Sequence, residues 1–106
     1  SPLHGWKVGA MHTLDIPLAF DHTRQPGSRT GDFAQAQMTA DAMSDALIAF
    51  ARSGDPNHAG LPHWPQYDLQ RRATMLFDAV LRVADDPRGG ERRLYERAPF
   101  VQRGTF

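Results

Sequence analysis

The chain has 106 residues, with 12 basic and 12 acidic side chains and a hydrophobic content of 41%. This length suits one domain or part of one, with a small core. The balanced charge offers no basic surface for nucleic acid or anionic lipid, and no apolar run reaches the ~18 residues that a membrane span requires. The sequence contains no cysteine, which excludes disulfides, thiol catalysis and thiolate metal sites within these residues.

The first third of the chain predicts little regular structure. Residues 1–11 are glycine-rich and are expected to be irregular. Residues 14–20 form an apolar patch in which Pro17 forbids a long helix. Residues 21–31 are polar and contain glycine and proline, which is typical of a surface loop.

A helix is predicted over residues 39–53. Apolar residues recur there at steps of three and four, which is the period of one helix face; they are Ala36, Ala40, Met43, Leu47, Phe50 and Ala51. Asp32 or Thr39 is a candidate N-cap, with a short turn over 33–36 as an alternative start. Gly54 is expected to cap the C-terminal end, and the Met43, Leu47 and Phe50 stripe to pack in the core.

The second half of the chain predicts an extended loop, a hairpin and a final helix. Residues 54–72 are rich in glycine and proline, and such long loops usually wrap another surface. Short strands are expected over 73–78 and 81–84, joined by a tight turn. A helix over about 88–97 should follow Pro87, with Leu94 and Tyr95 as its apolar contacts.

His12 is the candidate catalytic residue. An imidazole on a loop can move protons once one ring nitrogen is held by a carboxylate and the other faces a nucleophile. Asp15 lies three residues on, but triad members in most hydrolases come from separate loops, so Asp15 is not expected to orient His12. The residues alone leave two interpretations open: a catalytic histidine without its partners, or a structural histidine bonded to the backbone.

Three segments resemble the type B carboxylesterase family, the α/β-hydrolases that include bacterial para-nitrobenzyl esterases and cholinesterases. GAMHTLDIPLAF, from residue 9, is similar to the family's histidine motif. FARSGDPNHAGLPHWPQYD, residues 50–68, resembles its helix end, Gly-Asp-Pro-Asn turn and later Trp-Pro. ATMLFD, from residue 73, resembles a strand before a hairpin and a last helix. The three occur in the family's order and spacing.

The resemblance implies a fold and a role. Residues 1–106 would be the C-terminal part of a single α/β-hydrolase domain of the α/β class, without a separate second domain. His12 matches the triad histidine, and the serine, the triad acid and the oxyanion hole would lie upstream of Ser1. Asp15 matches an acidic position that fixes the histidine loop without taking part in the chemistry. The substrate would be a small-molecule ester, with no metal or organic cofactor, and the chain alone would be inactive.

Two positions depart from the family pattern. Leu47 stands where tryptophan is usual, which changes packing, and Thr13 follows the histidine where glycine or alanine is common, which weakens any inference about substrate. His58 and His63 lack a third metal ligand. The rival interpretation is a small non-catalytic module that binds a protein partner through the Pro/aromatic loop 61–67.

Overall fold

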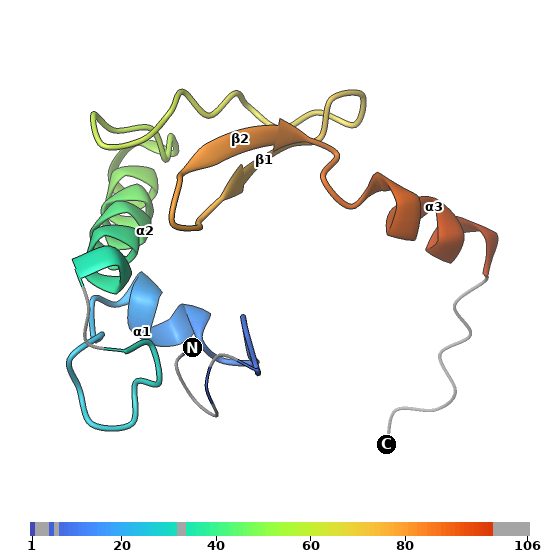
Figure 1. Cartoon of the computed structure of the whole chain (residues 1–106). Coiled ribbons are helices and arrows are strands. Elements are labelled where there is room, and N and C mark those ends of the chain that lie inside the picture. The colour runs from blue at the N-terminus through green and yellow to red at the C-terminus, as the bar shows by residue number, and fades with distance from the viewer. Residues whose placement is uncertain (2–4, 6, 32–33, 99–106) are drawn as a thin grey trace, which may run out of the picture.

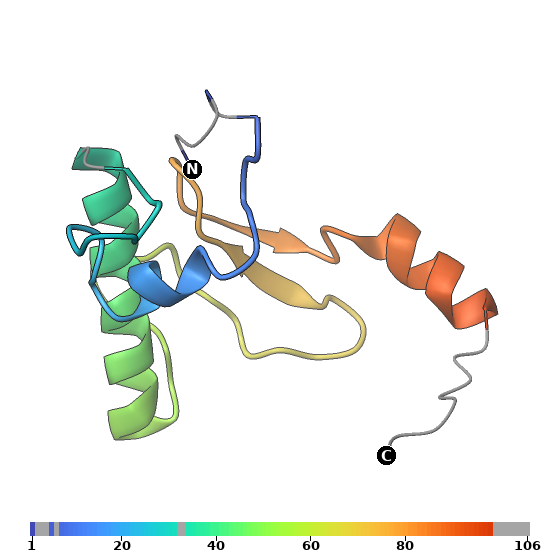
Figure 2. The ribbon, with the colours of Figure 1, turned by 90° about the horizontal axis from the view of Figure 1, so that it is seen from below.

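The computed structural model describes residues 1, 5, 7–31 and 34–98 of the chain. The elements follow in the order α1 (Asp15–Ala19), α2 (Ala34–Ser53), β1 (Ala73–Leu76), β2 (Arg82–Asp85) and α3 (Gly89–Arg97). Helix α1 packs across the N-terminal part of α2, the hairpin lies beside α2, and α3 extends away from the other elements (Figures 1 and 2). None of the helices in the described ranges is both long enough and apolar enough to span a membrane.

Helix α1 is short because Pro17 prevents its extension toward the N-terminus and the chain turns into a left-handed conformation at Asp21, where φ is +51°. The five residues of α1 begin inside the apolar patch, and Pro17 is its third residue, where a backbone N–H has no intrahelical partner to lose. The expectation that no long helix forms here is confirmed, although the patch is helical rather than irregular. The backbone N–H of Phe20, the C-cap residue, donates to the carbonyl oxygen of Ile16 in the last turn of the helix.

Helix α2 is longer than the sequence predicted. It begins at Ala34, and the residues before Thr39 are good helix formers with no breaker among them. Thr39 is therefore inside the helix and not an N-cap, and its hydroxyl donates to the Gln35 carbonyl oxygen at 3.0 Å. Asp32, the other candidate cap, lies outside the described residues. The C-terminal prediction is confirmed, because Gly54 has φ +77° and its N–H donates to the Phe50 carbonyl oxygen.

The core of the described residues is small and built from alanine. The buried apolar residues are Ala36, Ala40, Ala42, Ala46, Ala73 and Met75. The predicted core stripe on α2 is wrong in part, because Leu47 is 48% and Phe50 57% exposed. The physical reason is that the described residues supply only a two-stranded hairpin and one short helix near α2, which is too little surface to cover the large side chains of that stripe.

The hairpin and α3 are the last elements of the described chain. Strands β1 and β2 are antiparallel, with Ala73 opposite Asp85 and Leu76 opposite Arg82, and residues 54–72 form neither helix nor strand. These elements agree with the sequence prediction to within one or two residues at most ends. The predicted apolar contacts of the last helix are wrong, since Leu94 is 66% and Tyr95 77% exposed.

Candidate functional site

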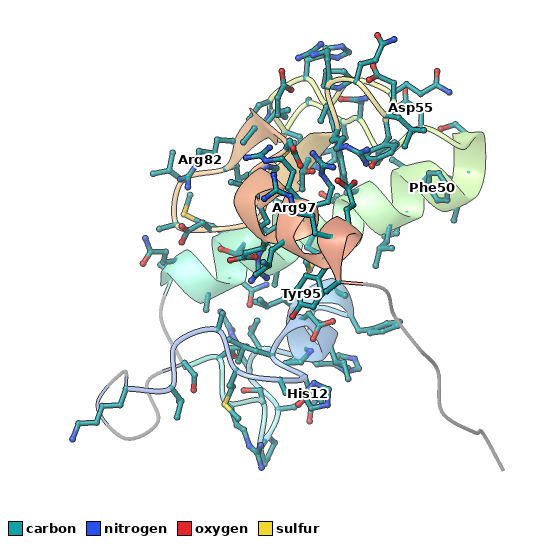
Figure 3. The ribbon with its side chains drawn as sticks, turned by 90° about the vertical axis from the view of Figure 1, so that its right-hand side faces the viewer. His12, Phe50, Asp55, Arg82, Tyr95 and Arg97 are labelled. Atoms are coloured by element: carbon teal, nitrogen blue, oxygen red, sulfur yellow. The ribbon has the colours of Figure 1, made fainter. Side chains whose placement is uncertain are left out.

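His12 lies in the turn that leads into α1. The N–H of Leu14 donates to the Met11 carbonyl oxygen at 3.2 Å, and the N–H of Ile16 donates to the Thr13 carbonyl oxygen at 3.3 Å. Thr13 has φ +69°, a left-handed conformation that is strained for a β-branched residue. The backbone therefore turns sharply at His12 and presents its side chain at the α1 end of the molecule (Figure 3).

The imidazole of His12 is exposed and is not engaged by the described part of the chain. Among the described residues, no hydrogen bond or ion pair to its ring is formed. His12 is among the residues that line a hollow of about 370 Å³. One wall is the turn and the start of α1, and the other is the polar segment that includes His22, Gln25 and Arg29. As far as the described residues are concerned, both ring nitrogens are open to groups from elsewhere.

Asp15 does not line that hollow. It is the first residue of α1, it is exposed, and it lines a different and larger groove. No hydrogen bond joins Asp15 to His12 in the described ranges. The two sequence-predicted site residues are thus close in sequence but line different spaces, and the roles of both stay predictions.

The larger groove has a volume of about 970 Å³ and lies between α2, β1 and the loop after α2. Its lining is mainly apolar and aromatic; the large side chains are Met43, Leu47, Phe50, Trp64, Tyr67 and Phe77. Asp15 and Ala19 of α1 line one part of it. A surface of this kind, unfilled by the described residues, is typical of an interaction or binding site.

The loop that borders the groove is held by side-chain hydrogen bonds. Both the backbone N–H and the Nδ2 group of Asn57 donate to Asp55 Oδ1, at 3.0 Å and 2.7 Å. These bonds lower the pKa of Asp55 below its ordinary value, because they favour the ionised form. Sequence reasoning recognised this Gly-Asp-Pro-Asn turn by family resemblance but assigned its side chains no partners.

The aromatic residues of loop 61–67 are engaged within the chain. Trp64 is half-buried and meets Phe77 edge to face, with ring centroids 6.2 Å apart and an interplanar angle of 74°. The Tyr67 hydroxyl, although on an exposed residue, accepts a hydrogen bond from Arg72 at 3.1 Å. If the chain were instead a protein-binding module, its partner would have to bind aromatic side chains that already make contacts within the chain.

The two histidines of the loop do not form a metal cluster with other described residues. No group of three or more histidine, cysteine, aspartate or glutamate side chains gathers in the described ranges. Both ring nitrogens of His58 are occupied: Nδ1 accepts from the Gly60 N–H, and Nε2 lies 3.1 Å from the Ala42 carbonyl oxygen. His63 is exposed at the rim of the groove.

Comparison with known proteins assigns the chain to a family. The model of the carboxylesterase family matches residues 2–94. Phenmedipham hydrolase from Pseudarthrobacter oxydans is 35% identical over 91 residues, which are 81% of this chain and 18% of that protein. Para-nitrobenzyl esterase from Bacillus subtilis is 25% identical over 88 residues, which are 79% of this chain and 17% of that protein.

Solved structures give the same result. A carboxylesterase of Geobacillus stearothermophilus matches with a TM-score of 0.69 and 41% identity, over 79% of this chain and 18% of that one. An esterase from Clostridium hathewayi that can hydrolyse aliphatic aromatic polyesters gives 0.72 and 36%, over 85% of this chain and 18% of that one. The chain thus spans under a fifth of the length of these relatives, and it matches part of their α/β-hydrolase structures. The resemblance read from the three segments is confirmed: this chain belongs to the carboxylesterase family.

Proposed function

We propose that the chain is the C-terminal part of a single α/β-hydrolase domain and that His12 is the general acid and base of its ester hydrolysis. The serine and the triad acid would come from the remaining portion of the hydrolase. The observation that carries the proposal is the exposed imidazole of His12, which lies on a fixed turn beside an open hollow and has both nitrogens available. Membership of the carboxylesterase family supports ester hydrolysis as the reaction in which this imidazole would take part.

The proposed reaction has two halves. The imidazole of His12 takes the proton from the serine hydroxyl as that oxygen attacks the ester carbonyl carbon, and then gives this proton to the departing alcohol. The acyl-enzyme that remains is attacked by water, whose proton passes to His12 and then to the serine oxygen as the acid leaves. No metal or organic cofactor is required for these steps, and the substrate class is a small-molecule ester.

The proposal requires this chain to dock onto the rest of the hydrolase. The large groove supports this, because Leu47 and Phe50 are about half exposed there and would lose that exposure in a contact. Asp15 faces the same groove, so we assign it the role of fixing the histidine turn against the partner portion. The chain by itself is expected to be inactive, since its sequence has no Gly-x-Ser-x-Gly nucleophile motif.

The first experiment replaces His12 in the complete hydrolase, meaning this sequence joined to the remaining hydrolase portion. His12→Ala should lower kcat for a short-chain nitrophenyl ester by roughly 10³-fold or more, because triad members act as a unit. His22→Ala is the matched variant, since His22 is the other imidazole on the same hollow. A His12→Ala enzyme with normal turnover, or a larger loss in His22→Ala, would remove His12 from the mechanism.

A second experiment tests docking. The chain and the remaining hydrolase portion, produced separately, should each be inactive and should regain ester hydrolysis on mixing. Phe50→Asp, in the groove, should weaken this recovery by at least about tenfold, because it places a charge in an apolar contact. Leu69→Asp is the control, because Leu69 is even more exposed but does not line the groove. Ester hydrolysis by the chain alone at enzyme-like rates would contradict the proposal.

A further inference from the structure

Gln37 of α2 connects that helix to the segment that follows α1. Its Oε1 accepts a hydrogen bond from the Thr23 hydroxyl at 2.7 Å. Its Nε2 donates to Asp21 Oδ1 at 2.5 Å and to Asp41 Oδ1 at 2.7 Å. The side-chain amide therefore uses its carbonyl oxygen and both of its N–H groups at once.

The chemistry of the neighbours fixes the orientation of this amide. Ionised carboxylates can only accept hydrogen bonds, so the NH₂ end of Gln37 must face Asp21 and Asp41. Without those two donors, the carboxylates of Asp21 and Asp41 would each lose the hydrogen bond that Gln37 donates to them. A neutral group that donates twice and accepts once is what this site needs, and among the standard side chains only asparagine and glutamine have that form.

The segment that Gln37 binds, residues 21–31, forms hydrogen bonds between its own two ends. The Thr23 carbonyl oxygen accepts from the Ser28 hydroxyl at 2.6 Å and from the Thr30 hydroxyl at 3.1 Å. Thr23 and Thr30 are each only 5% exposed, in a stretch that is otherwise mostly exposed. The two threonines therefore anchor the base of a loop over residues 21–31, which we call the threonine loop, and Gln37 ties that base to α2.

The threonine loop is also the far wall of the hollow beside His12. His22, Gln25, Pro26, Gly27, Ser28 and Arg29 line it opposite the turn. The loop starts directly after α1, where the His22 N–H donates to the Pro17 carbonyl oxygen at 2.8 Å. A change in how the loop is held would therefore alter the space next to the imidazole without touching His12.

We propose that Gln37 is a positioning residue for the ester site, which sets the width of the hollow beside His12 by fixing the threonine loop. The inference rests on the proposed function of His12. Gln37 itself does not reach the reacting atoms; it acts through the loop. The part of the ester that lies next to His12 would be received between the turn and this wall, so that its binding depends on the amide.

Gln37→Glu in the complete hydrolase is the main test, because it keeps the shape and replaces the two donors by an acceptor. We expect kcat/KM for a nitrophenyl ester to fall about tenfold or more, since three carboxyl groups then share one site. Adding Asp21→Asn should return kcat/KM to within about threefold of the parent, because asparagine supplies a donor again. Gln35→Glu, the same change at an exposed position of α2, is the matched control.

The pH profile separates positioning from a loss of folding. Crowding by Asp21 and Asp41 would raise the pKa of the introduced carboxyl, which regains a donor when protonated. The ratio of variant to parent kcat/KM should therefore rise as the pH falls from 8 to 5. His22 and Arg24 are the other charged or titratable side chains that line a hollow with Asp21 and Gln37, and they are present in both proteins. Gln37→Ala removes the hydrogen bonds of the amide without adding a charge. It should therefore lower kcat/KM by less than Gln37→Glu does, and the ratio to the parent should not change with pH.

Amide hydrogen exchange provides a readout that does not need activity. In Gln37→Glu, exchange at residues 22–30 should become faster, and Asp21→Asn should slow it again. Unchanged exchange, or faster exchange with parental kcat/KM, would overturn the role of Gln37. Failure of the proposed function is seen separately, as normal turnover in His12→Ala.

Discussion

Asn57 and Trp64, seven positions apart in the loop, exchange two hydrogen bonds. The Trp64 N–H donates to Asn57 Oδ1 at 2.7 Å, and Asn57 Nδ2 donates to the Trp64 carbonyl oxygen at 2.9 Å. The Asn57 side chain thus pairs with both backbone groups of Trp64, as a neighbouring strand would. Its Nδ2 group also donates to Asp55 Oδ1. One amide side chain therefore keeps Trp64 against Phe77 and shapes the border of the large groove.

Asn57→Asp should destabilise the complete hydrolase. The substitution replaces a double donor by a carboxylate that faces the Asp55 carboxylate and the Trp64 carbonyl oxygen. We expect the free energy of unfolding to fall by about 2 kcal/mol, measured by chemical denaturation. Gln70→Glu, at an exposed position of the same loop that does not line the groove, is the control and should change stability by less than about 0.5 kcal/mol. Equal effects of the two variants would show that added charge, and not the lost donors, is responsible.

Thr13→Gly should stabilise the protein. Thr13 has φ +69°, and a β-branched residue in that conformation stores strain that glycine does not. A gain of about 1 kcal/mol is expected, visible as a higher Tm. Thr39→Gly, in the interior of α2, should instead lower stability by roughly 0.3 kcal/mol, because glycine is a poorer helix former than threonine. A lower Tm in Thr13→Gly would show that the threonine side chain contributes more than its backbone costs.

His58 should carry its proton on Nε2. Its Nδ1 accepts from the Gly60 N–H at 3.1 Å, so that nitrogen must hold a lone pair, and Nε2 is then the donor to the Ala42 carbonyl oxygen. The ¹⁵N spectrum of histidine-labelled protein at neutral pH should show the Nε2–H tautomer for His58. An Nδ1–H tautomer would mean that the loop does not fold back on α2 in this way.

Acidification should loosen α3. Arg92 donates to both carboxylate oxygens of Asp86, at 2.8 Å and 3.1 Å, and this pairing lowers the pKa of Asp86. A carboxyl whose folded-state pKa is lowered stabilises the fold above its unfolded pKa, and that contribution is lost as the pH falls through the folded value. Amide exchange in residues 89–97, compared at equal intrinsic rate, should therefore show weaker protection below about pH 4.

Asp86→Asn should reproduce this loosening at neutral pH, because asparagine cannot pair with the guanidinium charge. Asp45→Asn, at an exposed position of α2, is the control and should leave exchange in α3 unchanged. Protection of α3 that is the same at pH 5 and pH 2.5 would show that the Arg92 pair does not hold the start of this helix.

The sequence by itself determined the elements that depend on neighbours along the chain. The apolar period and Gly54 located the end of α2, the two short segments joined by a tight turn located the hairpin, and Pro17 limited the first helix, because each signal acts within a few residues. The three motif segments also indicated the family. His12 was found in this way, since its motif is continuous, although its catalytic role stays a proposal.

Only the tertiary structure decided which side chains meet across the chain. Gln37 meets residues 14 and 16 positions earlier, and nothing in its local pattern marks it, because a polar residue on a helix face is usually solvated. Likewise, Leu47 and Phe50 have the period of a core stripe but face an open groove, since periodicity gives the direction of a side chain and not what covers it. Packing and hydrogen bonding between distant residues depend on the path of the whole backbone, which no short window of sequence contains.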